Sequence, residues 1–185
     1  MFDPRSTALA SCLLLAGGPA LADGFVISSG GLAHDCYLAA NAGTATDNAV
    51  RLCGSALAQD GLDLHDRAGT FINRGTLLLK RKDWAAALAD FDDGARVAPE
   101  IGEIYVNRAA ALIGLKRFAE AVTASDKGIS LNPSELEKAY FNRATARELT
   151  GDVEGAYHDY MKAVELAPDW QQPKDELKRF KVEAK

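Results

Sequence analysis

The sequence predicts an all-α protein, built as a solenoid of antiparallel helix pairs and closed by a C-terminal capping helix. Three observations support this prediction. An Asn-Arg pair followed by a small residue occurs three times, at intervals of 34 and 35 residues. A proline follows each of these asparagines after 26 residues, and large and very small residues recur in step with both. The asparagines are Asn73, Asn107 and Asn142, and the prolines are Pro99, Pro133 and Pro168.

The size pattern becomes clear when the three units are counted from Ala68, Gly102 and Glu137. Positions 8 and 20 are glycine or alanine in every copy, position 4 is aromatic, and position 24 is aromatic in two copies. A small residue lets two helices approach, and an aromatic ring fills the space beside it. In order of position, these residues are Phe71, Tyr105 and Tyr140; Gly75, Ala109 and Ala144; Ala87, Ala121 and Ala156; and Phe91, Ser125 and Tyr160.

This pattern resembles the tetratricopeptide repeat (TPR), whose consensus places small residues at positions 8 and 20 and a proline at position 32. The resemblance covers about 101 of the 185 residues. It implies a scaffold that binds a peptide or protein partner rather than an enzyme, because the function of such an array lies in its binding sites. Two departures, Ser125 at position 24 and Arg147 at position 11, predict local repacking within the same fold.

The chain divides into four parts. Residues 1–22 are predicted to be a signal peptide, 23–66 a degenerate helical pair with a flexible lead at 23–31, 67–168 three TPR repeats, and 169–185 a capping helix. Proline and Gly-Asp turns separate the helices that we expect within the repeats. These helices span 67–81, 83–97, 101–115, 117–130, 134–150 and 152–166, and the capping helix spans 171–182.

The first 22 residues have the three parts of a secretory signal. Arg5 is basic, residues 8–16 are apolar, and the sequence Ala-Leu-Ala at 20–22 is a small-x-small cleavage site before Asp23. The apolar run is far shorter than the roughly 20 residues that span a bilayer. A buried N-terminal helix and lipidation at Cys12 are the alternatives. We therefore expect a periplasmic or secreted protein with no membrane anchor after cleavage.

Composition excludes several classes of function. The net charge is −5 and no cluster of lysine and arginine occurs, so nucleic acid is not an expected partner. None of the sequence motifs typical of serine hydrolases, P-loop nucleotide-binding proteins or zinc metalloproteases is present, and we expect neither catalytic residues nor a cofactor. The expected partner is a protein or a peptide.

Cys36 and Cys53 are the only cysteines after residue 22. When Ala49 is placed at position 20 of a degenerate repeat, these cysteines fall at positions 7 and 24, which face each other across the helix pair. An exported chain with an even number of cysteines usually pairs them, so the sequence predicts a structural disulfide. The alternatives are buried free thiols, a thiol-redox protein that uses Cys36 and Cys53, and a metal site, for which the usual ligand spacing is absent.

Arginine recurs at position 7, which is apolar in the TPR consensus. Arg74 and Arg143 are followed after 16 residues by Asp90 and Asp159, on the helix that faces each arginine. An unpaired buried charge is strongly destabilising, so we expect two ion pairs within repeats. The second copy has Ala124 at the corresponding position, and Arg108 is expected to reach back to Asp90.

Position 6 of each repeat is asparagine, and the resemblance implies that this position points into the concave groove of the array. An amide group can donate to and accept from the main chain of an extended peptide. The predicted peptide-binding residues are Asn73, Asn107 and Asn142, with the apolar neighbours Ile72, Val106 and Phe141. The alternative is that these amides bond only to neighbouring helices. The lysines of a carboxylate clamp are absent apart from Lys138, so we expect an internal segment as the ligand.

Overall fold

The computed structural model describes residues 18–21, 24–27, 30–59 and 61–180. Regular secondary structure in these ranges is entirely helical, which confirms the predicted fold class. The helices are α2 (Leu32–Asn41), α3 (Asp47–Leu57), α4 (Leu64–Lys80), α5 (Trp84–Val97), α6 (Gly102–Gly114), α7 (Phe118–Ser130), α8 (Leu136–Thr150), α9 (Val153–Leu166) and α10 (Gln171–Leu177).

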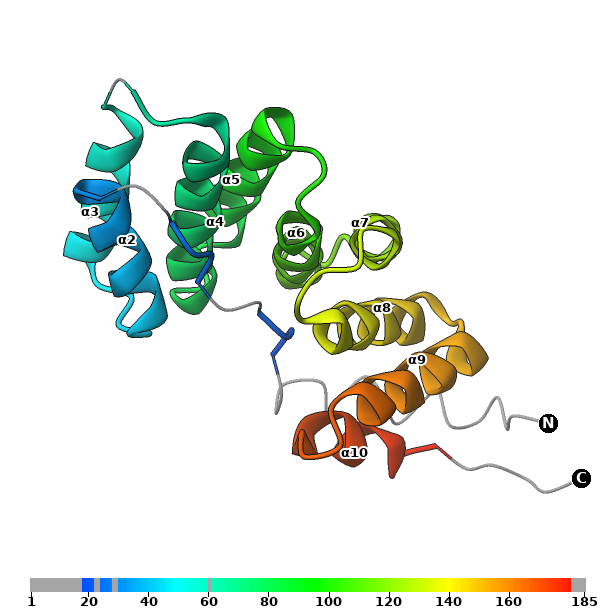
Figure 1. Ribbon diagram of the computed structural model, residues 1–185. Coiled ribbons are helices and arrows are strands. Elements are labelled where there is room, and N and C mark those ends of the chain that lie inside the picture. Colours follow the sequence, from blue (N-terminus) through cyan, green and yellow to red (C-terminus); the bar gives the residue numbers. More distant parts are fainter. Residues whose placement is uncertain (1–17, 22–23, 28–29, 60, 181–185) are drawn as a thin grey trace, which may run out of the picture.

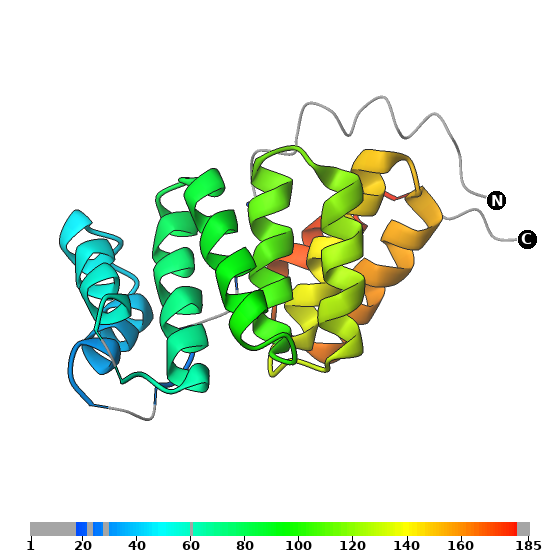
Figure 2. The same cartoon turned by 90° about the horizontal axis from the view of Figure 1, so that it is seen from above.

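Successive helices pack as antiparallel pairs, and the pairs stack side by side (Figure 1). The three predicted repeats are the pairs α4–α5, α6–α7 and α8–α9, and α2–α3 forms a further pair before them. The first helix of each repeat contacts the first helix of the next, so α4, α6 and α8 form one continuous layer. The view from above shows the same stacked order of the pairs (Figure 2).

Complementary residue sizes explain the close packing within a repeat. Gly75 on α4 faces the ring of Phe91 on α5, and a Cβ atom at Gly75 would lie 2.5 Å from Phe91 Cε1. In the third repeat, Ala144 and Tyr160 belong to one buried cluster. A longer side chain at position 8 would therefore collide with the aromatic residue at position 24.

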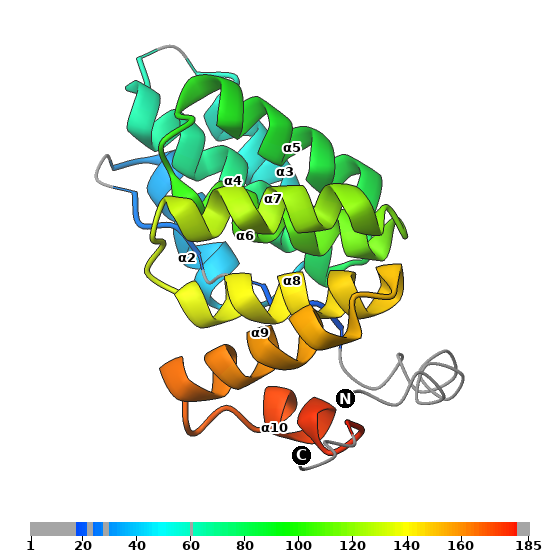
Figure 3. The same ribbon diagram turned by 90° about the vertical axis from the view of Figure 1, so that its right-hand side faces the viewer.

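The ends of the array differ slightly from the prediction. Helix α4 begins at Leu64, before the predicted start at residue 67, because the Asp63 carboxylate accepts from the Asp66 backbone N–H at 2.7 Å and caps the helix. Helix α10 packs against α9, as Figure 3 shows, but it ends at Leu177 rather than continuing to residue 182. Residues 181–182 of that predicted helix lie outside the described ranges.

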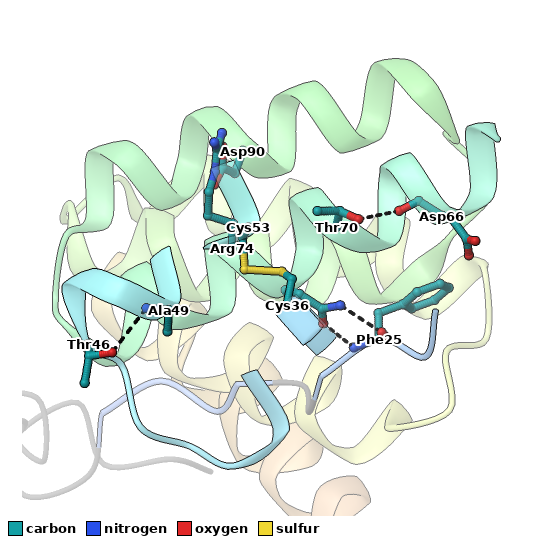
Figure 4. Close-up of a disulfide and its surroundings, with 10 residues drawn as sticks. Phe25, Cys36, Thr46, Ala49, Cys53, Asp66, Thr70, Arg74 and Asp90 are labelled. Carbon is teal, nitrogen blue, oxygen red and sulfur yellow. Dashed lines mark hydrogen bonds and ion pairs between the residues drawn. A yellow bond between two sulfur atoms is a disulfide. The ribbon is translucent and has the colours of Figure 1, made fainter. Parts of the chain in front are cut away.

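A disulfide joins the two helices of the N-terminal pair, as predicted (Figure 4). The Cα atoms of Cys36 on α2 and Cys53 on α3 lie 4.8 Å apart, and both residues are fully buried. The Lys80 ammonium group donates to the Ala40 carbonyl at 3.0 Å, which ties this pair to the end of α4.

Residues 24–27 contradict the prediction of a flexible lead at 23–31. They run along α4, Phe25 is bonded to it through main-chain groups, and Ile27 is buried among apolar residues of α2 and α3. Residues 18–21, which belong to the predicted signal peptide, lie against α8 and α10 (Figure 1). The rest of that predicted signal, residues 1–17 and 22, lies outside the described ranges.

Candidate functional site: an asparagine-lined groove and its occupant

Asn73 binds the main chain of the N-terminal segment from its position on α4. Its side chain is fully buried. The Phe25 backbone N–H donates to Asn73 Oδ1 at 2.7 Å, and Asn73 Nδ2 donates to the Phe25 carbonyl at 2.9 Å. Both main-chain polar groups of Phe25 are therefore satisfied by one amide (Figure 4).

Asn142 repeats this arrangement two repeats further on, on α8. The Ala20 backbone N–H donates to Asn142 Oδ1 at 2.9 Å, and Asn142 Nδ2 donates to the Ala20 carbonyl at 2.8 Å. The same Nδ2 donates to the Val106 carbonyl on α6 at 3.2 Å. This asparagine thus combines binding of an extended segment with a bond between neighbouring helices, the role considered as the alternative.

Asn107 lies between these two clamps, on α6, and it is also fully buried. Its Nδ2 atom donates to Thr76 Oγ1 on α4 at 3.3 Å. Residues 22 and 23 connect the two bound parts of the segment and lie outside the described ranges. The structure therefore assigns a helix-to-helix bond to Asn107, and its predicted part in peptide binding stays a prediction.

The predicted apolar neighbours are buried while the segment is in place. Phe141 belongs to the cluster that contains Ala20. Ile72 belongs to the large central cluster, and Leu21 and Phe25 pack against that cluster. Val106 is buried with Ala139. Whether these side chains form pockets for a partner stays a prediction.

Three contacts of the segment were missed at the sequence level. Gln172 Nε2 on α10 donates to the Gly18 carbonyl at 2.9 Å. The rings of Phe25 and His65 lie 5.1 Å apart, and a Cβ atom on Gly69 would lie 2.7 Å from side-chain atoms of both Phe25 and Ile27. Gly69 is the feature of the sequence that could have indicated this close approach. It stands at position 2 of its repeat, where the other repeats carry Glu103 and Lys138.

An open pocket beside the segment extends the groove towards the starts of α6 and α8. Residues 24–26 form one wall, and His65, Glu103, Ser134 and Glu135 form the other. The Glu103 carboxylate accepts from the Ser134 backbone N–H at 2.9 Å, which fixes the loop that precedes α8. The N-terminal segment therefore leaves this part of the groove open.

The arginines at position 7 of the first and third repeats pair with buried aspartates on the second helix of the same repeat. Arg74 makes two hydrogen bonds to Asp90, at 2.9 and 2.6 Å, and Arg143 makes two to Asp159, at 2.8 and 2.7 Å, as predicted. Burial raises the pKa of the Asp90 carboxyl, and the hydrogen bond from Arg74 opposes that shift.

The prediction for Arg108 was wrong. Its Nε atom donates to Asp92 at 2.7 Å, whereas Asp90 accepts two hydrogen bonds from Arg74. Arg147, one of the departures from the consensus, donates to Asp159 at 2.8 Å and so joins the Arg143 pair. That contact is the local repacking expected at this position.

Other kinds of site find no support in the described part of the chain. No group of three or more histidine, cysteine, aspartate or glutamate side chains there is arranged to hold a metal ion. Within the same residues, no helix combines the length and the apolar character that crossing a membrane requires. The two cysteines are bonded and buried, whereas reactive cysteines are usually accessible.

Comparison with known proteins finds similarity over part of the chain. Residues 102–135 and 137–169 match the family model described as Tetratricopeptide repeat. The chain is 32% identical over 115 residues to the DnaJ homolog subfamily C member 7 homolog of Dictyostelium discoideum, an alignment that covers 60% of this chain. The chain spans about a fifth of the length of the curated relatives it matches, 20% in this case.

Two solved structures show the same arrangement of helices. The Arabidopsis OM64 TPR domain is 27% identical with a TM-score of 0.60, and the match covers 63% of this chain and 95% of that domain. The second TPR domain of human RPAP3, solved in complex with the HSP70 peptide SGPTIEEVD, is 25% identical with a TM-score of 0.58; that match covers 63% of this chain and 96% of the domain.

A stacked array of helix pairs with a peptide-like segment along one face defines a helical-repeat binding scaffold rather than an enzyme. Residues 102–135 and 137–169 match the tetratricopeptide repeat, and the similarity to the relatives and the solved structures extends over about 60% of the chain.

Proposed function

We propose that this protein is an exported scaffold that binds an extended, internal segment of a partner protein in the groove lined by Asn73, Asn107 and Asn142. The observation that carries the proposal is the pair of two-bond clamps on Phe25 and Ala20. Each clamp reads an N–H and a C=O of one residue, which every extended polypeptide offers. Such a groove selects an extended main chain first and side chains second.

The chemistry of the groove favours an internal segment over a free C-terminus. A terminal carboxylate needs positively charged side chains that converge on it. The nearest candidate, Lys138, pairs with Glu135 on the preceding turn. RPAP3 was solved with an HSP70 peptide that ends in acidic and apolar residues, and we propose a different kind of ligand for the present groove.

Export follows from the cleavage site before Asp23 and accords with the Cys36–Cys53 disulfide, since such bonds persist in oxidising compartments. Cleavage there would remove residues 18–22 and leave Phe25 in the Asn73 clamp. The part of the groove around Asn142 would then be open to a partner. We place the protein in the periplasm or outside the cell.

The test is to change Asn73, Asn107 and Asn142 to alanine together and to measure the proteins that the immobilised chain retains from an envelope fraction. We expect the retained partner to be lost. Asn48→Ala is the matched control, because Asn48 is exposed on α3 and accepts a hydrogen bond from Arg51, one turn away on the same helix. Retention by the triple variant at the level of the control would contradict groove binding. Thermal melting measured in parallel separates lost binding from a lost fold.

A further inference from the structure

The N-terminal segment uses the groove in the way a bound peptide does. From Gly18 to Ile27 its main chain is held at three residues, by Gln172, Asn142 and Asn73. It runs from α10 towards α4, opposite to the order of the helices (Figure 1).

The side chains of the segment also occupy defined seats. Ala20 is 7% exposed and packs into the cluster that contains Phe141 and Tyr160, so a small residue fits there. Ile27 is 4% exposed and packs with Ala33 and Ala56. Phe25 lies between the His65 ring and the glycine at 69. Val26, which lies between Phe25 and Ile27 in the sequence, is 63% exposed and has no such seat.

We propose that residues 18–21 and 24–27 are a tethered competitor that displays the sequence class of the partner. The partner segment would then have a small residue at the Asn142 clamp, an aromatic residue five positions later and a branched aliphatic residue seven positions later. This inference rests on the groove binding proposed above, names its ligand more closely, and concerns the chain before cleavage removes residues 18–22.

Competition follows from the atoms involved. Asn142 Oδ1 and Asn73 Oδ1 accept from the segment, and the two Nδ2 atoms donate to it. A partner that uses the same amides must displace Ala20 and Phe25. Because the segment is joined to the array, its effective concentration is on the order of millimolar, and it lowers the apparent affinity for a peptide supplied from solution.

The experiment measures binding of a fluorescent peptide with the sequence of residues 18–27, GPALADGFVI, to the full chain by anisotropy. The opened variant carries Phe25→Asp and Ile27→Asp, which prevent its own segment from seating. We expect this variant to bind the peptide at least about tenfold more tightly than the unchanged chain. Val26→Asp is the matched control, and it should bind like the unchanged chain.

Two additions test the seats. Asn73→Ala and Asn142→Ala in the opened variant should abolish the gain in affinity. A peptide with tryptophan in place of the alanine at position 20 should bind the opened variant at least about tenfold more weakly, because the seat admits only a small side chain. A peptide with tryptophan in place of the valine at position 26 should bind normally.

Equal affinity of the opened and unchanged chains would overturn the competitor. Equal affinity of the two tryptophan peptides would overturn the proposed sequence class. Should the opened variant fail to fold, hydrogen exchange on the unchanged chain decides: excess peptide must accelerate exchange at the Ala20 and Phe25 amides. No acceleration also overturns the competitor, whereas loss of the native partner in the asparagine variants would still support the groove.

Discussion

Arg74, Arg108 and Arg143 occupy a position that is apolar in the repeat consensus. Each pairs with an aspartate on the second helix of a repeat, α5 or α9. The guanidinium groups of Arg74 and Arg143 lie over aromatic rings three residues earlier, Phe71 and Tyr140, with their central carbons 5.9 and 5.2 Å from the ring centroids. An arginine can therefore replace an apolar residue here, because its stem packs while its charged end is paired.

The Arg74–Asp90 pair predicts a clear effect on stability. Asp90 is 4% exposed, so Arg74→Ala would leave a nearly buried carboxylate without its partner. We expect Arg74→Ala to lower the free energy of unfolding by more than the ~1 kcal/mol of an exposed pair. Chemical denaturation measures this loss.

The control is Arg96→Ala, since Arg96 pairs with Asp93 on the surface, with its side chain 75% exposed. That variant should cost less than about 1 kcal/mol. A double-mutant cycle with Asp90→Ala isolates the interaction, and an absence of coupling would rule out the pair as the cause.

At the scale of helices, the N-terminal pair depends on a covalent bond as well as on packing. The cluster that surrounds Cys36 and Cys53 is small, with Ala40, Ala49 and Leu77 as its other buried members. The disulfide closes a loop of 17 residues between two helices of modest length. Such a loop accounts for roughly 3 kcal/mol in the chain-entropy treatment.

Replacement of both cysteines by alanine should therefore lower the free energy of unfolding by about 3 kcal/mol. Reduction of the unchanged chain should produce a similar loss, whereas the double variant should not respond to reductant. Two titratable thiols in the native oxidised protein would contradict the bond. A reduction potential below about −300 mV supports a structural role, and a value between about −200 and −120 mV would favour the thiol-redox alternative.

Over the whole molecule, the N-terminal segment connects the two ends of the array. Residue 20 bonds to Asn142, 122 positions later, and residue 25 bonds to Asn73, 48 positions later. If export proceeds as proposed, cleavage after Ala22 separates these two bound parts. Processing would then convert a groove that is occupied at both clamps into one that is open at Asn142.

The protein isolated from the envelope should accordingly begin at Asp23. Amino-terminal sequencing or intact mass measures this directly. Ala22→Leu should block processing, because the cleavage site requires a small residue, while Ala10→Leu within the apolar run should leave it unchanged. An intact Met1 on protein that remains in the cytoplasm would contradict export.

The repeat period and the size pattern were sufficient to predict the helix pairs, because residues that face each other within a repeat recur at fixed local spacing. The same reasoning located the facing cysteines and the two ion pairs within repeats, Arg74–Asp90 and Arg143–Asp159. It failed for Arg108, since the choice between Asp90 and Asp92 depends on how the second repeat stacks on the first and not on spacing within one repeat.

Sequence alone therefore determined the architecture and the chemistry of the asparagine positions, both of which depend on contacts within one or two neighbouring repeats. Only the tertiary structure decided what two of the amides hold. The N-terminal segment shows no periodicity, and its described residues, 18–21 and 24–27, bind mainly through their main chain, which is the same in every sequence. Their seats combine α2, α3, α4, α8 and α10, and only the stacking of the pairs brings these helices to one groove.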